Sequence, residues 1–211
     1  MFNEKYQPKT FTDLVFQSDI SRKRLEKYAT GENTGNLLLY GPYGSSKTTA
    51  ARIVANQSAK LDGALFEMDV EVLNCADFDS KSVSLLERGW QGSGQNFSYA
   101  VLDEFDLVSK RDQAKVRALI DRYEDRNGLI LTTNHLELID GAIQSRCEVI
   151  DMPAPMPFKL LPRCKSILTQ EGVTLDDSDI LAAIKYEKGD MRQVLRQLER
   201  IISKSRQKDA A

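Results

Sequence analysis

The segment that decides the fold of this 211-residue chain reads Gly41-Pro42-Tyr43-Gly44-Ser45-Ser46-Lys47-Thr48-Thr49. It follows a short apolar run, Asn36–Tyr40, and leads into a stretch with helical character, Thr48–Gln57. A loop that wraps a phosphate must aim its backbone N–H groups inward, which requires small residues and unusual dihedral angles. A helix that starts directly after such a loop adds the positive end of its dipole. The segment is therefore predicted to be a phosphate-binding loop between a strand and a helix.

The lysine of this loop and the hydroxyl residue after it have distinct predicted tasks. Lys47 is expected to reach the β- and γ-phosphates of a nucleotide, and the Thr48 hydroxyl is expected to bind Mg²⁺. The candidate nucleotide-binding residues of the loop are Gly41, Gly44, Ser45, Ser46, Lys47, Thr48 and Thr49.

One residue departs from the strict pattern G-x-x-x-x-G-K-[ST], because Ser46 stands where that pattern has its second glycine. Serine adds a Cβ where the backbone closes on the phosphate, so nucleotide affinity or turnover is expected to suffer. The alternative interpretation of the segment is a Ser/Thr-rich turn before a helix.

A second motif is an apolar strand that ends in two carboxylates, Tyr99-Ala100-Val101-Leu102-Asp103-Glu104. Asp103 is predicted to hold the hydration shell of Mg²⁺, and Glu104 to orient and activate the attacking water. An exposed acidic turn after a strand is the alternative, and the preceding phosphate loop argues against it.

The strand pattern predicts an α/β fold. Continuous apolar runs are typical of strands covered on both faces, and alternating strands and helices imply a mostly parallel sheet with right-handed crossovers. A helix is predicted over Lys110–Tyr123, and the Gly/Gln/Ser-rich stretch Gly89–Ser98 is predicted to be a loop. The five expected strands are Asn36–Tyr40, Ala64–Met68, Tyr99–Leu102, Leu129–Thr133 and Val149–Met152.

A proline-rich segment, Met152–Pro157, predicts a domain boundary, since three prolines in it cannot continue a helix or an inner strand. Three helical patterns follow and are expected to form a small lid: Phe158–Gln170, Asp177–Glu187 and Asp190–Ser205. The expected division is a nucleotide-binding domain at residues 1–152, a linker at 153–157, a helical lid at 158–206 and a disordered tail at 207–211.

Composition restricts the class of protein further. With 41% hydrophobic and 28% charged residues the chain is typical of a globular domain, and no run approaches the roughly 20 apolar residues of a membrane span. The N-terminus lacks the apolar core of a secretion signal, so a cytoplasmic or nucleoplasmic location is expected.

The three cysteines, Cys75, Cys147 and Cys164, lack metal-ligand spacing and are predicted to be free thiols. A net charge of −2 provides no general attraction to nucleic acid, so DNA binding would need a local basic patch.

Taken in this order, the motifs resemble those of AAA+ ATPases, and their details resemble clamp-loader subunits: replication factor C, its archaeal relatives and the phage clamp loaders. Lys5–Phe11 resembles the family segment K-Y-R-P-K-T-F, with Gln7 in place of Arg. Asp13–Gln17 resembles D-L-V-G-Q, with Phe16 in place of Gly. The resemblance implies that Tyr6 and Pro8 contact the adenine of a bound nucleotide.

Three further segments extend the resemblance, which covers nearly the whole chain. Thr132-Thr133-Asn134 resembles the first sensor motif and implies that Asn134 lies near the γ-phosphate and the attacking water. Ser145-Arg146-Cys147 is similar to the S-R-C motif, whose arginine reaches the ATP site of the neighbouring subunit. Gly189-Asp190-Met191-Arg192 resembles the second sensor, whose arginine reaches from the lid to the nucleotide. A lone arginine is more often a surface or ion-pairing residue, and membership of this ordered set favours a function for Arg146 and Arg192.

Basic residues gather on and around the predicted helix after Asp103 and Glu104. The corresponding region of clamp loaders faces the ring interior and follows DNA phosphates, and such contacts are independent of base sequence. A solvated helical face is the alternative, because acidic residues are interleaved. The candidate DNA-binding residues are Lys110, Arg111, Lys115 and Arg117, with Arg122 and Arg126 nearby.

The resemblance implies an ATP-hydrolysing subunit of a DNA sliding-clamp loader that uses ATP and Mg²⁺. Its implied partners are other subunits in a ring, expected to be a pentamer, a sliding clamp and primer–template DNA. Two alternatives are a ring subunit that binds nucleotide with weak or no hydrolysis, which Ser46 motivates, and another AAA+ DNA-remodelling motor. Clamp-loader subunits carry a further helical collar domain, so the chain is either a piece of a longer protein or assembles through another surface. The lack of a four-cysteine zinc module favours the eukaryotic, archaeal or phage branch.

Overall fold

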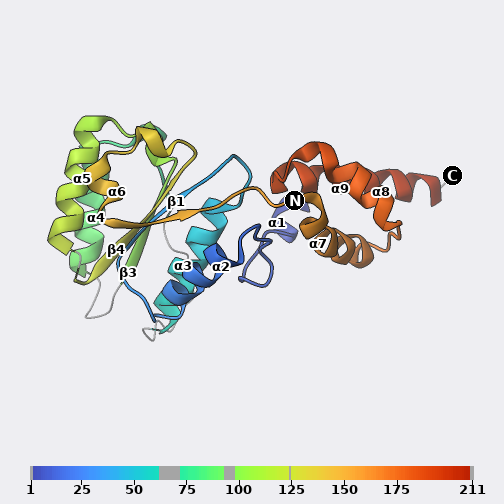
Figure 1. Ribbon diagram of the computed structural model, residues 1–211, viewed down its shortest axis with the longest axis horizontal. Coiled ribbons are helices and arrows are strands. Elements are labelled where there is room, and N and C mark those ends of the chain that lie inside the picture. The colour runs from blue at the N-terminus through green and yellow to red at the C-terminus, as the bar shows by residue number, and fades with distance from the viewer. Residues whose placement is uncertain (1, 62–71, 93–97, 124, 210–211) are drawn as a thin grey trace. The chain divides into compact units, whose positions relative to one another are not determined.

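The computed structural model describes residues 2–61, 72–92, 98–123 and 125–209 (Figure 1). These residues form two compact units. The sheet unit comprises the described residues of Ile20–Gly41 and Lys47–Asp151. The helical unit comprises the described residues of Met1–Asp19, Pro42–Ser46 and Met152–Ala211. Residues 1–19 therefore group with the C-terminal helices, whereas the sequence assigned them to the nucleotide-binding domain.

The sheet unit is built on one five-stranded parallel sheet, in the order β2-β3-β4-β1-β5. This arrangement confirms the predicted α/β fold. The expected strand at Ala64–Met68 lies outside the described residues, and β2 is found at Val72–Asn74. The strands are β1 Asn36–Tyr40, β2 Val72–Asn74, β3 Ser98–Asp103, β4 Asn127–Thr133 and β5 Cys147–Asp151.

Helices cover both faces of this sheet (Figure 1). Helices α4 (Ser80–Gly92) and α5 (Lys110–Tyr123) lie on one face, together with the short α6 (Gly141–Gln144). Helices α2 (Asp19–Ala29) and α3 (Lys47–Leu61) lie on the other. Because both faces are covered, Leu37, Leu38 and Leu39 are all fully buried, which explains the continuous apolar run of β1.

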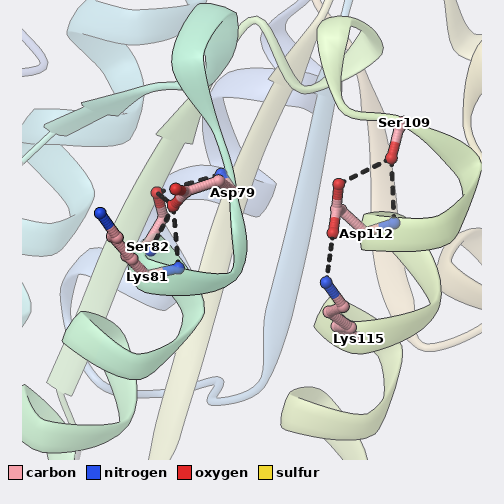
Figure 2. Close-up of polar contacts among 6 residues, drawn as sticks. All are labelled: Asp79, Lys81, Ser82, Ser109, Asp112 and Lys115. Atoms are coloured by element: carbon pink, nitrogen blue, oxygen red, sulfur yellow. Dashed lines mark hydrogen bonds and ion pairs between the residues drawn. The ribbon is translucent and has the colours of Figure 1, made fainter.

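The helices α4 and α5 begin with side-chain caps, which Figure 2 shows. Asp79 Oδ1 accepts from the backbone N–H groups of Lys81 and Ser82 at 2.8 and 3.0 Å. At the start of α5, Ser109 Oγ accepts from the Asp112 N–H at 3.2 Å and donates to the Asp112 carboxylate at 2.7 Å. Such caps satisfy N–H groups that a helix leaves unpaired at its first turn. The predicted loop at Gly89–Ser98 is wrong in its first part, because α4 continues through Gly92.

The helical unit contains α1 (Phe2–Lys5), α7 (Pro157–Gln170), α8 (Asp177–Ile184) and α9 (Met191–Asp209). Its buried core joins residues of these three C-terminal helices, such as Leu160, Ile180 and Leu198, with the ring of Tyr6. The predicted lid helices are therefore present. A disordered tail from residue 207 was expected, whereas α9 continues to Asp209. Among the described residues, no helix is long and apolar enough to cross a membrane.

Candidate nucleotide-binding site

The predicted phosphate-binding lysine begins α3 and is buried, with 7% of its surface exposed. Its Nζ donates to the Gly41 carbonyl at 2.9 Å and to Asn134 Oδ1 at 2.8 Å. Gly41 follows β1 and Asn134 follows β4, and the two strands are adjacent in the sheet. The structure thus brings together Gly41, Lys47 and Asn134, three candidates from separate parts of the sequence.

The two predicted magnesium-binding groups also meet at this edge of the sheet. The Thr48 hydroxyl donates to Asp103 Oδ1 at 2.6 Å. A second hydroxyl, that of Thr132, donates to the same oxygen at 2.5 Å. Asp103 lies at the end of β3 and Thr132 near the end of β4, so adjacent parallel strands account for the convergence. In open α/β sheets, ligands bind at such carboxyl ends of the strands.

The candidate water-activating carboxylate has an unusual backbone. Glu104 adopts a left-handed conformation with φ 59° and ψ 45°, which costs a residue other than glycine roughly 1–2 kcal/mol. Its N–H donates to Thr132 Oγ1 at 3.2 Å. Its Oε2 accepts from Asn74 Nδ2 at 3.4 Å, and Asn74 Oδ1 in turn accepts from the Ala76 N–H at 2.8 Å. The Glu104 carboxylate is thus held toward the end of β2.

Asn74 was missed from the sequence, and the contact of Thr132 with Asp103 was not predicted. Asn74 ends β2 and pairs with Asp103 in the β2–β3 register. The expected second strand, Ala64–Met68, lies outside the described residues, and no strand was predicted at Val72–Asn74, so the contact of Asn74 with Glu104 was not predicted. Thr132 was recognised as part of a motif, and its contact with Asp103 depends on the register of β3 and β4.

The central part of the phosphate loop, Pro42–Ser46, contains two left-handed residues. Gly44 has φ 73°, and a Cβ built there would lie 2.2 Å from Asp190 Cγ. The Gly44 carbonyl also accepts from the Met191 N–H at 3.2 Å. Ser46 has φ 66°, so the serine that replaces the expected glycine adopts a conformation that favours glycine. The effect of Ser46 on nucleotide affinity or turnover stays a prediction.

The groups at this edge fit a nucleotide with Mg²⁺. Lys47 supplies an ammonium group for phosphate oxygens, and Thr48 and Asp103 supply a hydroxyl and a carboxylate for a hard cation. Magnesium typically takes one or two carboxylates, phosphate oxygens and water rather than a cage of protein ligands. The described residues contain no group of three or more His, Cys, Asp and Glu that could hold a metal ion.

Residues 37–152 match the family described as "ATPase family associated with various cellular activities (AAA)", which is more than half of the chain. The chain belongs to the AAA family. The match includes the phosphate loop and the carboxyl ends of β1, β3 and β4.

Similarity to individual AAA proteins extends over nearly the whole chain. It is 29% identical to replication factor C small subunit 1 of Pyrobaculum arsenaticum over 215 residues, which covers 98% of this chain and 63% of that protein. It is 28% identical to replication factor C subunit 5 of Mus musculus, over 93% of this chain and 58% of that protein. It is 30% identical to the replication factor C small subunit of Staphylothermus marinus, over 94% of this chain and 61% of that protein. The chain thus spans about three fifths of the length of these relatives.

Arg146, the candidate for action on a neighbouring subunit, is exposed and bound by its own chain. Its Nε and Nη2 donate to the two carboxylate oxygens of Asp121 at 2.5 and 3.2 Å, and its Nη1 donates to the Ala142 carbonyl at 2.8 Å. Hydrogen bonding to Arg146 lowers the pKa of Asp121 from its ordinary value of 3.8. The guanidinium is therefore fixed against α5 and α6 of the sheet unit.

Arg192 and Tyr6, two further candidates, belong to the helical unit. Arg192 lies in the first turn of α9, where its backbone N–H donates to the capping Asp190 at 2.9 Å and its side chain is exposed. The Tyr6 ring is 4% exposed within the core, and its hydroxyl donates to Glu171 at 2.5 Å. The ring therefore offers little surface for a base in this conformation. Pro8 is half-buried, and Thr49 is half-buried in the first turn of α3.

The basic residues on and just after α5 divide into two groups. Arg111, Arg117 and Arg126 form no ion pair with any residue that the structure describes. Three others are engaged: Lys110 donates to the Leu138 carbonyl at 2.6 Å, Lys115 pairs with Asp112 at 2.6 Å (Figure 2) and Arg122 pairs with Glu87 at 2.5 Å. Of these three arginines, Arg111 and Arg126 are exposed and Arg117 is half-buried.

The three cysteines are free thiols, as predicted. Burial raises the pKa of Cys75 and of Cys147 to about 12 and that of Cys164 to about 11. Because the thiolate is the reactive form, these cysteines are poor nucleophiles at neutral pH.

Proposed function

We propose that this chain is an ATP-hydrolysing subunit of a ring that loads a DNA sliding clamp onto primer–template DNA. The observation that carries the proposal is the meeting of Lys47, Thr48, Asp103 and Asn134 at the carboxyl edge of a parallel sheet. Similarity to replication factor C subunits over nearly the whole chain supports the choice of a clamp loader among AAA functions. A cytoplasmic or nucleoplasmic location follows from this function.

In the proposed reaction, the residues at the sheet edge position ATP and water. Lys47 binds β- and γ-phosphate oxygens, and Asn134 orients the attacking water beside the γ-phosphate. Thr48 and Asp103 would hold Mg²⁺, which would neutralise negative charge on the phosphates of ATP. Glu104 accepts a proton from water as the water oxygen bonds to the γ-phosphorus and the bond to the β–γ bridging oxygen breaks. The Asn74 contact must loosen for Glu104 to turn toward that water.

Two arginines complete the proposed site from outside the sheet edge. Arg146 acts on the nucleotide of a neighbouring subunit, and arginines supplied in this way contribute about 10³–10⁵-fold to hydrolysis in analogous enzymes. Arg192 contacts the nucleotide of its own chain, and Pro8 lies near the adenine, whereas the ring of Tyr6 is buried in the helical core. Hydrolysis would then depend on assembly of the ring, which we expect to be a pentamer.

DNA is proposed to contact basic side chains of α5, above all Arg111, which is exposed, and Arg117, which is half-buried. The first N–H groups of α4 and α5 are already bound by Asp79 and Ser109 (Figure 2), so the charged side chains are better suited than the helix termini to meet phosphates. Such contacts would be independent of base sequence and weakened by salt.

One alternative has a specific observation in its favour. The left-handed Ser46 favours a ring subunit that binds nucleotide and hydrolyses it poorly. Lys47, Asp103, Glu104 and Asn134 argue against this alternative. A different AAA DNA-remodelling motor is less well supported, because the relatives named above are replication factor C subunits.

The proposal is tested by steady-state ATP hydrolysis of the protein in complex with its own ring partners. Rates are compared for ATP alone, ATP with sliding clamp, and ATP with clamp and primer–template DNA. Strong stimulation only with clamp and DNA together supports the clamp loader. Negligible turnover in rings that assemble and bind ATP favours the alternative of a ring subunit that binds nucleotide and hydrolyses it poorly. Turnover that responds to DNA and not to the clamp favours another motor.

A further inference from the structure

Thr132 occupies a central place in the sheet unit. It is the penultimate residue of β4, it pairs with Leu39 of β1, and only 1% of its surface is exposed. A hydroxyl buried in a sheet requires hydrogen-bond partners, and the partners of Thr132 are both at the candidate catalytic edge.

The Thr132 hydroxyl both donates and accepts a hydrogen bond. It donates to Asp103 Oδ1 at 2.5 Å and accepts from the Glu104 N–H at 3.2 Å. One oxygen atom on β4 thus ties the side chain of the proposed magnesium-binding residue to the backbone of the proposed water-activating residue.

Both bonds restrain groups that are otherwise poorly constrained. Asp103 Oδ1 also accepts from the Thr48 hydroxyl, whose oxygen is predicted to bind Mg²⁺. Thr132 has no predicted contact with the metal, so its bond can hold Asp103 in place both with and without Mg²⁺. Glu104 lies in the left-handed region, and such conformations persist only when their surroundings enforce them. The bond from its N–H to Thr132 is one such constraint.

We propose that Thr132 is a positioning residue that aligns the Asp103 carboxylate for Mg²⁺ and fixes the backbone from which Glu104 reaches the attacking water. This inference rests on the proposed function. It assigns to Thr132 no contact with the nucleotide.

The adjacent residue is a matched control. Thr133 is fully buried, donates to Asp106 Oδ1 at 2.8 Å and accepts from the His135 N–H at 2.9 Å. Its hydroxyl therefore makes the same two kinds of bond, to a carboxylate and to a backbone amide, without touching Asp103 or Glu104. Thr133→Val and Thr132→Val remove equal numbers of hydrogen bonds from adjacent positions of one strand.

The experiment measures ATP affinity with Mg²⁺ and with excess chelator for the wild-type chain, Thr132→Val, Thr132→Ser and Thr133→Val. We expect Mg²⁺ to enhance the affinity of the wild type, and Thr132→Val to lose about tenfold of that enhancement, since a hydrogen bond to a charged group is lost. Thr132→Ser should restore it, and Thr133→Val should retain it to within about twofold. If Thr132→Val does not fold, Thr132→Ala replaces it, because alanine also lacks the hydroxyl and has a smaller side chain.

Amide hydrogen exchange of the nucleotide-free chain provides a second readout that is independent of activity. Thr132→Val should speed exchange at the Glu104 N–H and leave His135 unchanged, and Thr133→Val should do the reverse. A role confined to folding would instead lower the melting temperature in both variants and leave the Mg²⁺ enhancement intact.

Two outcomes would overturn the inference, and they differ in what they leave standing. Equal Mg²⁺ enhancement in the wild type, Thr132→Val and Thr133→Val would remove the role of Thr132 and leave the proposed function untouched. A wild-type chain whose ATP affinity does not respond to Mg²⁺ would overturn both.

Discussion

Two carboxylates, Asp103 in the sheet unit and Glu171 in the helical unit, each accept several hydrogen bonds, and they do so from different kinds of donor. Glu171 accepts from the Lys5 ammonium at 2.6 Å, the Arg206 guanidinium at 2.6 Å and the Tyr6 hydroxyl at 2.5 Å. Asp103 accepts from the hydroxyls of Thr48 and Thr132 and forms no ion pair with any residue that the structure describes.

The difference separates a structural contact from a binding site. Hydrogen bonding to Lys5 and then to Tyr6 lowers the pKa of Glu171 to about 2, as expected for a carboxylate whose charge is matched by the protein. Neutral hydroxyls hold Asp103 in place without matching its charge. A carboxylate arranged in this way is suited to receive a cation from outside the protein.

The largest effect is expected at Glu104. Glu104→Gln should retain ATP binding and lose about 10²–10⁴-fold of the rate of hydrolysis in assembled rings, because the amide cannot accept a proton from water. Paired measurements of ATP affinity and turnover test this. Normal turnover would exclude Glu104 as the water-activating residue and weaken the assignment of the whole sheet edge.

A change at Asp103 should affect binding and spare folding. Asp103→Asn is expected to lower ATP affinity in the presence of Mg²⁺ by about 10–100-fold, since a charge-assisted contact is worth about 1.5–3 kcal/mol. The melting temperature without nucleotide should be nearly unchanged, because an asparagine oxygen can still accept from the two hydroxyls. A large fall in melting temperature with unchanged affinity would make Asp103 a structural residue like Glu171.

Glu171 should show the opposite pattern, a change in stability that depends on pH. Its pKa is lowered in the folded chain from the ordinary value of 4.5 to about 2, so its stabilisation is fully present above pH 4.5 and is lost as the pH falls from 4.5 through 2. Glu171→Gln should remove this part of the acid dependence, measured by thermal melts across that range. Its neighbour Gln170 is exposed on the surface, so Gln170→Ala serves as a control that should keep the wild-type profile.

The smallest effect is expected at Ser46. Ser46→Gly relieves a left-handed conformation that costs a non-glycine residue about 1–2 kcal/mol, partly offset by the greater freedom of glycine in the unfolded chain. Turnover should be equal or faster, and stability should rise by less than about 1 kcal/mol. A large loss of turnover would show that the serine itself serves the reaction.

The sequence predicted much of the sheet unit because its signals are local. The predicted bounds of β1 and α5 match the structure, and the apolar runs at Leu129–Thr133 and Val149–Met152 fall largely within β4 and β5. The phosphate loop and the strand ending in Asp103 were recognisable because each places a small set of residue types in one short segment.

Contacts between distant segments were not predictable in the same way. The bond from Thr132 to Asp103 depends on strand register, and the contact of Asn74 with Glu104 depends on β2, which was not among the expected strands. Tyr6 was assigned to adenine by resemblance, whereas its ring is buried among residues of the C-terminal helices. An aromatic residue in a short motif does not reveal from sequence whether its ring faces a ligand or a core.

The measurement that tests the account most directly is titration of ATP with Mg²⁺ into the wild-type chain and into Lys47→Ala. The account predicts saturable binding to the wild type and a loss of about 100-fold or more in the variant, since the Lys47 ammonium is the group placed to meet the phosphates. Thermal melts of both chains without nucleotide verify that the variant is folded. Equal affinities in two folded chains would contradict the claim that this edge of the sheet binds the nucleotide.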